Sequence, residues 1–214
     1  MARQIVWLSL WAVAFAFIES SVVVYLRKIY YPEGFAFPLT PIEPNILLNE
    51  LVREAMTLVV IWTTAQLSYT RLQSRVAAFL ILFGIWDIFY YIFLKIVLDW
   101  PASFGTWDIL FLIPTPWVGP VWAPMLVAMT LAAFGICILK ENANGRYIPY
   151  SWRFVVLEGI AGTIIVLSFI IPGIDIFEGG DPGTFPSAIF WIGYLFGLIP
   201  FLRHHYKSIA SGRK

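Results

Sequence analysis

The sequence predicts an all-α, polytopic integral membrane protein that crosses the bilayer with six transmembrane helices, in a single domain of residues 1–214. The first observation is composition: 60% of the residues are hydrophobic and 13% are charged, too few polar side chains to cover a soluble domain of this length. The second is a set of six segments of about 20 mostly apolar residues, the length that a membrane-spanning helix needs. The third is an alternation of basic and acidic connections between these segments.

The six predicted spans cover approximately residues 4–27, 46–69, 75–98, 117–139, 152–172 and 185–202. The first begins like a secretory signal peptide, because Arg3 precedes an apolar run. The run continues past Glu19 to Leu26, which is longer than the apolar region of a signal peptide. We therefore expect this segment to be retained as a membrane anchor and first span.

The connection between the third and fourth spans is rich in proline. The apolar run WDILFLI at residues 107–113 is followed by prolines at positions 114, 116, 120 and 124. Proline removes a backbone donor and disfavours helix in the residue before it, so an ordinary straight span cannot begin here. The pattern predicts a short interfacial or re-entrant helical turn that leads into a kinked fourth helix. A tryptophan-rich interfacial belt without a cavity is the alternative.

The distribution of charge predicts the orientation. Ten of the 14 Lys and Arg residues lie near the chain ends or in and beside the second and fourth connections. The opposite side carries the acids Asp99, Asp108, Asp175, Glu178 and Asp181. Because basic connections stay in the cytoplasm, this asymmetry predicts a multi-pass protein of the cell inner membrane with both termini cytoplasmic.

Four acids interrupt the first three spans. Glu19 lies in the first span, Glu50 and Glu54 in the second and Asp87 in the third, at similar heights in the half predicted to face outward. Each charge in hydrocarbon costs about 2.5–3.5 kcal/mol on the insertion scale, so these acids must face a polar interior. Consecutive spans are usually neighbours in space, which predicts that the acids lie together.

Helical spacing extends this predicted polar site. Asp87, Tyr91 and Lys95 follow one another at intervals of four, so they share one helix face that leads outward. Carboxylates also suit hard metal ions, which makes Glu19, Glu54 and Asp87 candidate metal ligands. A network that only locks the helices together is the alternative. The candidate ligand- or ion-binding residues are Glu19, Glu50, Arg53, Glu54, Trp86, Asp87, Tyr90, Tyr91, Lys95, Trp107 and Asp108.

Two further features lie in the last two spans. Glu158 stands near the cytoplasmic end of the fifth span, so we expect it to snorkel to the surface or to pair with Arg153. Gly193 and Gly197, at a spacing of four, predict that the sixth helix closely approaches a neighbouring helix.

Composition argues against several other functions. The only histidines, His204 and His205, lie in the C-terminal tail and Cys137 is the single cysteine, so no haem or Cys/His metal centre is expected. No nucleotide-binding motif and no Gly-x-Ser-x-Gly element occurs. A net charge of +1 without a basic patch argues against nucleic acid. The expected partner is the lipid bilayer, and a homo-oligomer or a membrane complex stays open.

Residues 86–124, WDIFYYIFLKIVLDWPASFGTWDILFLIPTPWVGPVWAP, resemble a family of six-span bacterial membrane proteins described only as hypothetical. The resemblance implies six spans and no activity. The placement of membrane acids near tryptophans is also similar to that of the emopamil-binding sterol isomerases, without a shared motif that would carry residue roles to this chain.

Carboxylates, tyrosines and an arginine can relay protons, bind cations or amines, hold a metal, or act as acid and base. The leading hypothesis is a small transporter or binding protein for a cation or small polar solute, with a buried carboxylate site that opens outward. One alternative is a membrane-embedded enzyme that uses carboxylate or metal chemistry on a lipid or isoprenoid. The other is a structural subunit of a membrane complex.

Overall fold

Six α-helices make up most of the computed structural model, which describes residues 2–177, 180–181 and 183–211. Each predicted span corresponds to one helix. The charged residues Glu178, Arg213 and Lys214, used above to predict orientation, lie outside the described residues. The helices are α1 (Ala2–Tyr30), α2 (Pro44–Ser68), α3 (Leu72–Leu98), α4 (Trp122–Ala143), α5 (Trp152–Phe177) and α6 (Ser187–Ser211).

Five of these helices, all except α2, are long and apolar enough to cross a membrane. Large apolar side chains also cover the outside of the bundle: Trp7 is 64% exposed and Trp152 is 77% exposed. Soluble proteins rarely expose wide apolar surfaces, so the chain is built as a multi-pass membrane protein. A crossing by α2, which carries Glu50, Arg53 and Glu54 in its first half, stays a prediction, as do the inner membrane and the orientation of the termini.

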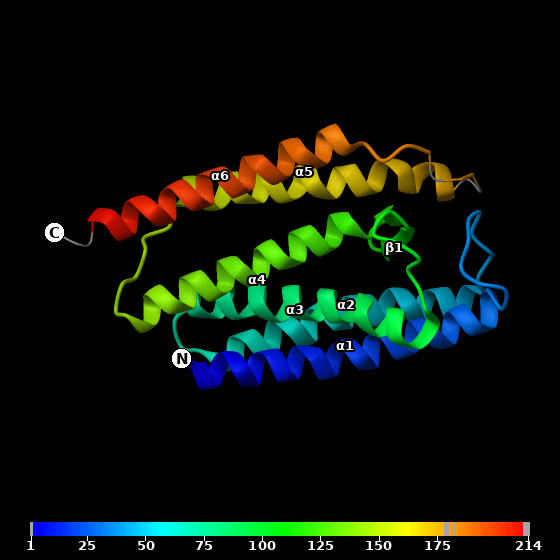
Figure 1. Cartoon of the computed structure of the whole chain (residues 1–214), viewed down its shortest axis with the longest axis horizontal. Helices are drawn as coiled ribbons and strands as arrows, with labels where there is room; N and C mark the ends of the chain where they lie inside the picture. Colours follow the sequence, from blue (N-terminus) through cyan, green and yellow to red (C-terminus); the bar gives the residue numbers. More distant parts are fainter. Residues whose placement is uncertain (1, 178–179, 182, 212–214) are drawn as a thin grey trace.

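The helices run back and forth along one long axis (Figure 1). In that view α1, α2 and α3 lie on one side, α4 packs on α3, and α5 and α6 form a pair on the other side. The two chain ends lie at one end of the bundle, which we call the termini end. The β1 strand lies toward the opposite end, which we call the hairpin end.

Small residues allow two of the helix pairs to approach closely. A Cβ added to Gly84 of α3 would lie 2.3 Å from the carbonyl oxygen of Ala128 on α4. A Cβ on Gly193 of α6 would lie 2.9 Å from the backbone nitrogen of Ile165 on α5, and one on Gly197 would also meet α5. The close approach predicted from Gly193 and Gly197 is therefore confirmed.

The segment between α3 and α4 is a β-hairpin, so the predicted helical turn is wrong. Strands β1 (Trp107–Phe111) and β2 (Trp117–Pro120) pair antiparallel, with Ile109 opposite Val118. The prolines explain the difference, because those at 114 and 116 lie in the turn, where no ladder donor is needed. Pro124 falls in the first turn of α4, where proline is tolerated, so it does not stand where it would kink the helix.

The hairpin contacts both halves of the bundle. A Cβ on Gly173 of α5 would lie only 1.9 Å from the carbonyl oxygen of Pro116, so α5 touches the hairpin backbone directly. Trp107 packs edge to face against Phe185, which precedes α6. The opposite side of the hairpin, which carries Asp108, lines a cavity together with α1, α2 and α3.

Candidate functional site

A cavity of about 450 Å³ lies toward the hairpin end, between α1, α2, α3 and the hairpin. The connection between α1 and α2 and Ile176 of α5 complete its wall. We call it the acid cavity. It brings together most of the candidate residues predicted from the sequence, namely Glu19, Glu50, Arg53, Glu54, Trp86, Asp87, Tyr90, Tyr91 and Asp108.

Arg53 holds two of the acids in this cavity. Its guanidinium donates hydrogen bonds to Glu19 on α1 and to Glu50, which lies three residues earlier on α2. The Glu19 and Glu50 side chains are 7% and 6% exposed, so both ion pairs are shielded from solvent. One guanidinium is therefore shared between two carboxylates, so these three side chains together carry an excess of negative charge.

A second arginine at the site, Arg27, is buried and is not among the candidate residues predicted from the sequence. Its Nη2 donates to Asp108 Oδ1 at 2.7 Å, and its Cζ lies 3.6 Å from the centre of the Trp100 ring and 4.5 Å from that of Phe35. The Tyr91 hydroxyl donates to the other oxygen of Asp108 at 3.1 Å. Burial raises the pKa of Asp108, and the Arg27 guanidinium opposes that rise.

A sequence signal for Arg27 was present. Glu19, Val23 and Arg27 follow one another at intervals of four, so they share a face of α1, and all three line the acid cavity. The burial of Arg27 depends on Trp100 and Asp108, which lie far away in the sequence, so the periodicity of α1 alone does not reveal it.

Glu54 and Asp87 are not held by a base. Glu54 Oε2 accepts a hydrogen bond from the backbone N–H of Leu112, beyond the end of β1, at 2.8 Å. The Asp87 carboxylate has no hydrogen-bond or ion-pair partner within the described part of the chain. The acid cavity is thus lined by five carboxylates and two guanidinium groups.

Two candidate residues do not line the acid cavity. Lys95 sits at the end of α3, where its Nζ lies 2.8 Å from Asp99 Oδ1 and donates to the carbonyl oxygen of Pro101. The hydrogen bond from the Lys95 ammonium to the Asp99 carboxylate, together with the positive charge of Lys95, lowers the pKa of Asp99. Trp107 faces away because successive side chains of a strand point to opposite faces, so Asp108 faces the cavity and Trp107 does not.

The proposed metal ligands are not gathered at one point. Among the described residues, no three His, Cys, Asp or Glu side chains lie close enough together to hold a metal ion. Glu19 is turned toward Arg53 and Glu54 toward the hairpin backbone, while Asp87 is on α3. The metal site predicted from Glu19, Glu54 and Asp87 is therefore not supported, because Glu19 and Glu54 are oriented by different partners and the three carboxylates do not converge.

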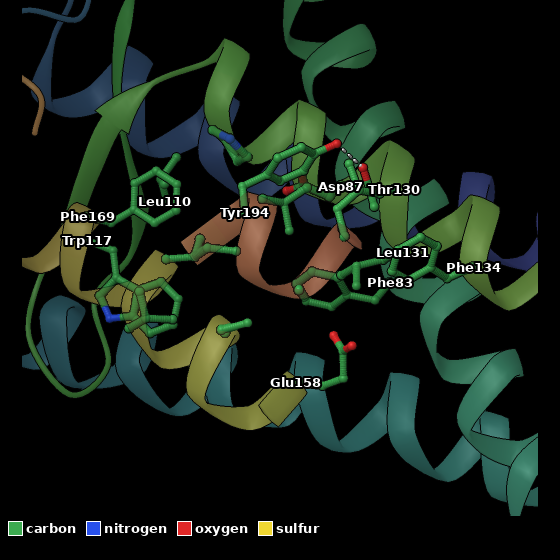
Figure 2. Close-up of a pocket in the computed structure, with 18 of the residues that line it drawn as sticks. Phe83, Asp87, Leu110, Trp117, Thr130, Leu131, Phe134, Glu158, Phe169 and Tyr194 are labelled. Carbon is green, nitrogen blue, oxygen red and sulfur yellow. Dashed lines mark hydrogen bonds between the residues drawn. The ribbon is translucent and has the colours of Figure 1, made fainter. Parts of the chain in front are cut away.

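A second cavity of about 300 Å³ lies between α3, α4, α5 and α6 (Figure 2). We call it the Glu158 cavity, since the Glu158 carboxylate points into it from α5. Glu158 is half-buried, with Oε1 enclosed, and contrary to the sequence expectation it does not pair with Arg153. Asp87 lines this cavity as well as the acid cavity.

Comparisons of this chain with known protein families, with curated proteins and with solved structures find no match. The geometry of the two cavities is therefore the basis for a functional assignment.

Proposed function

We propose that this membrane protein binds a small organic cation, such as an amine, in the acid cavity and transports it. The observation that carries the proposal is the charge of the wall, where the Asp87 carboxylate has no partner in the described chain and Glu54 has only a backbone N–H. An apolar surrounding makes an uncompensated carboxylate costly, about 2.5–3.5 kcal/mol on the insertion scale. A bound cation would remove that cost.

The rest of the cavity wall favours an organic cation over a bare metal ion. Rings of Tyr30, Trp86, Tyr90 and Phe111 line it, and aromatic faces attract organic ammonium groups. A volume of about 450 Å³ lies within the usual range of sites for small molecules. The scattered carboxylates supply charge over a wide surface, which suits a ligand with an ammonium group and an apolar body.

The depth of the site supports transport. Asp87 lies 11 residues before the end of α3, about 16 Å of helix, and 15 residues after its start, about 22 Å. A ligand that reached it from the hairpin end would therefore stand near the middle of the bundle. Transporters commonly bind their substrates near the bilayer midplane.

The first test measures binding of benzylamine to the purified protein in lipid nanodiscs by titration calorimetry. Benzyl alcohol, of similar size and shape but without charge, is the matched ligand. We expect benzylamine to bind and benzyl alcohol to bind at least tenfold more weakly, since charge-assisted hydrogen bonds contribute about 1.5–3 kcal/mol. Asp87→Asn should weaken benzylamine binding by about 10- to 100-fold for the same reason.

Asp99→Asn is the control variant, because Asp99 is an exposed acid directly after α3, the helix that carries Asp87, and lies outside the cavity. It should bind benzylamine as the unmodified protein does. Equal affinity for the amine and the alcohol, or full affinity in Asp87→Asn, would rule out the proposed cation site. Transport is checked separately by uptake of radiolabelled benzylamine into proteoliposomes, which Asp87→Asn should abolish.

A further inference from the structure

The Glu158 cavity holds a carboxylate that the proposed binding site does not use. Glu158 Oε1 is buried without a hydrogen-bond partner among the described residues. Its other oxygen lies where a side chain on α6 would interfere, because a Cβ on Gly197 would be 3.2 Å from Glu158 Oε2. The missing side chain at Gly197 therefore makes room for a carboxylate inside the bundle.

The wall around Glu158 is otherwise mostly apolar. Phenylalanines 83, 134 and 169 contribute rings to it, and the hydroxyls of Thr130 and Tyr194, 2.8 Å apart, add polar groups (Figure 2). No arginine or lysine among the described residues lines this cavity. A volume of about 300 Å³ has room for roughly ten water molecules at about 30 Å³ each. Carboxylates and hydroxyls would give such waters the polar partners that they need.

Asp87 connects the two cavities. It lines the acid cavity on the side of α1 and α2 and the Glu158 cavity on the side of α5 and α6. Glu158 is six residues from the start of α5, about 9 Å of helix, so the second cavity extends from the middle of the bundle toward the termini end. Together the two cavities follow most of the length of the helices.

We infer that Asp87 and Glu158 are successive carriers on a proton route through the bundle. Protonated Asp87 gives its proton to a water molecule of the Glu158 cavity, and the Glu158 carboxylate takes up a proton from that water chain. Asp87 is left as a carboxylate and Glu158 as a neutral acid, so one proton has moved and no other bond has changed. Chains of intramembrane acids serve as proton relays in pumps and transporters.

The proton route uses Asp87 of the acid cavity but does not require that an amine binds there.

The charged and titratable groups around Asp87 differ from those around Glu158. The titratable residues that line the acid cavity with Asp87 are Glu19, Arg27, Tyr30, Tyr31, Glu50, Arg53, Glu54, Tyr90, Tyr91 and Asp108, and those that line the Glu158 cavity with it are Glu158 and Tyr194. Facing Glu158 across its own cavity are Asp87 and Tyr194.

The test measures proton entry into proteoliposomes that contain a pH-sensitive dye, driven by a potassium diffusion potential, with and without benzylamine. We expect Glu158→Gln to reduce the rate to that of protein-free vesicles. Glu158→Asp keeps a carboxylate and should retain part of the rate. Glu33→Gln makes the same chemical change at an exposed residue of the first connection and should leave the rate unchanged.

Benzylamine binding separates this inference from the proposed function. Glu158 does not line the acid cavity, so Glu158→Gln should bind benzylamine normally, and normal binding also shows that the variant is folded. Full proton entry in Glu158→Gln, or no protein-dependent entry with or without benzylamine, would overturn the proton route and leave the cation site standing. A failure of benzylamine to bind while proton entry depends on Glu158 would reject the cation site alone.

Discussion

Replacing Arg27 by methionine tests the ion pair that joins α1 to the hairpin. Methionine keeps most of the length of the side chain and removes the charge. In the intact protein the Arg27 and Asp108 side chains are 9% and 1% exposed, and their nearest atoms are 2.7 Å apart. The variant leaves Asp108 with the Tyr91 hydroxyl as its remaining side-chain partner in the described chain.

Removing one partner of a buried ion pair costs about 3–5 kcal/mol, because the other charge stays buried without compensation. Arg27 also stacks on the Trp100 ring at 3.6 Å, and cation–π contacts contribute about 0.5–2 kcal/mol. We therefore expect Arg27→Met to lower the free energy of unfolding by about 3.5–7 kcal/mol in total. Lys28→Met, at an exposed neighbour, should change it by less than about 0.5 kcal/mol.

Unfolding in mixed micelles on addition of SDS, followed by tryptophan fluorescence, measures these differences. The double variant Arg27→Met/Asp108→Asn removes both charges, so its loss should be at least about 1 kcal/mol smaller than the sum of the two single losses. A loss below about 1 kcal/mol in Arg27→Met, or additive losses in the double variant, would show that the pair is not a buried interaction.

The pH dependence of Arg27→Met gives an independent check. Burial raises the pKa of Asp108, and Arg27→Met removes the positive charge that opposes that rise. The folded variant then binds a proton more tightly than the unfolded chain, so its stability falls as the pH increases from about 4 toward the folded pKa. The intact protein should show a smaller slope over the same range.

Two further predictions concern packing and the end of α3. Gly84→Ala should destabilise the protein by about 1–3 kcal/mol, since its Cβ would overlap the Ala128 carbonyl, whereas Gly159→Ala, with open space around it, should be neutral or stabilising in the same SDS titration. The pKa of Asp99, measured by carbon NMR of the carboxylate, should lie below the ordinary value of about 3.9 and return to it in Lys95→Met. The small stabilisation from Lys95 is then present at pH values above the ordinary pKa of Asp99 and is lost as the pH falls through the lowered pKa. An Asp99 pKa that is the same in Lys95→Met as in the intact protein would contradict this prediction.

The sequence by itself determined the helices and the polarity of the interior. A span of about 20 apolar residues and the cost of a charge in hydrocarbon are properties of a single segment, so they can be read without knowing its neighbours. This is why Glu19, Glu54 and Asp87 were expected in one polar site, and all three line the acid cavity. Asp108 was also expected there, although the strand that carries it was not.

Only the tertiary structure decided which groups meet. The pairing of Arg27 with Asp108 joins residues 81 positions apart, and the hairpin that presents Asp108 forms because two proline-bounded segments pair with each other. Glu158 faces inward because of how α5 is rotated against α6, where Gly197 leaves space for its carboxylate. The rotation and neighbours of a helix depend on all the elements packed around it, and local periodicity does not contain that information.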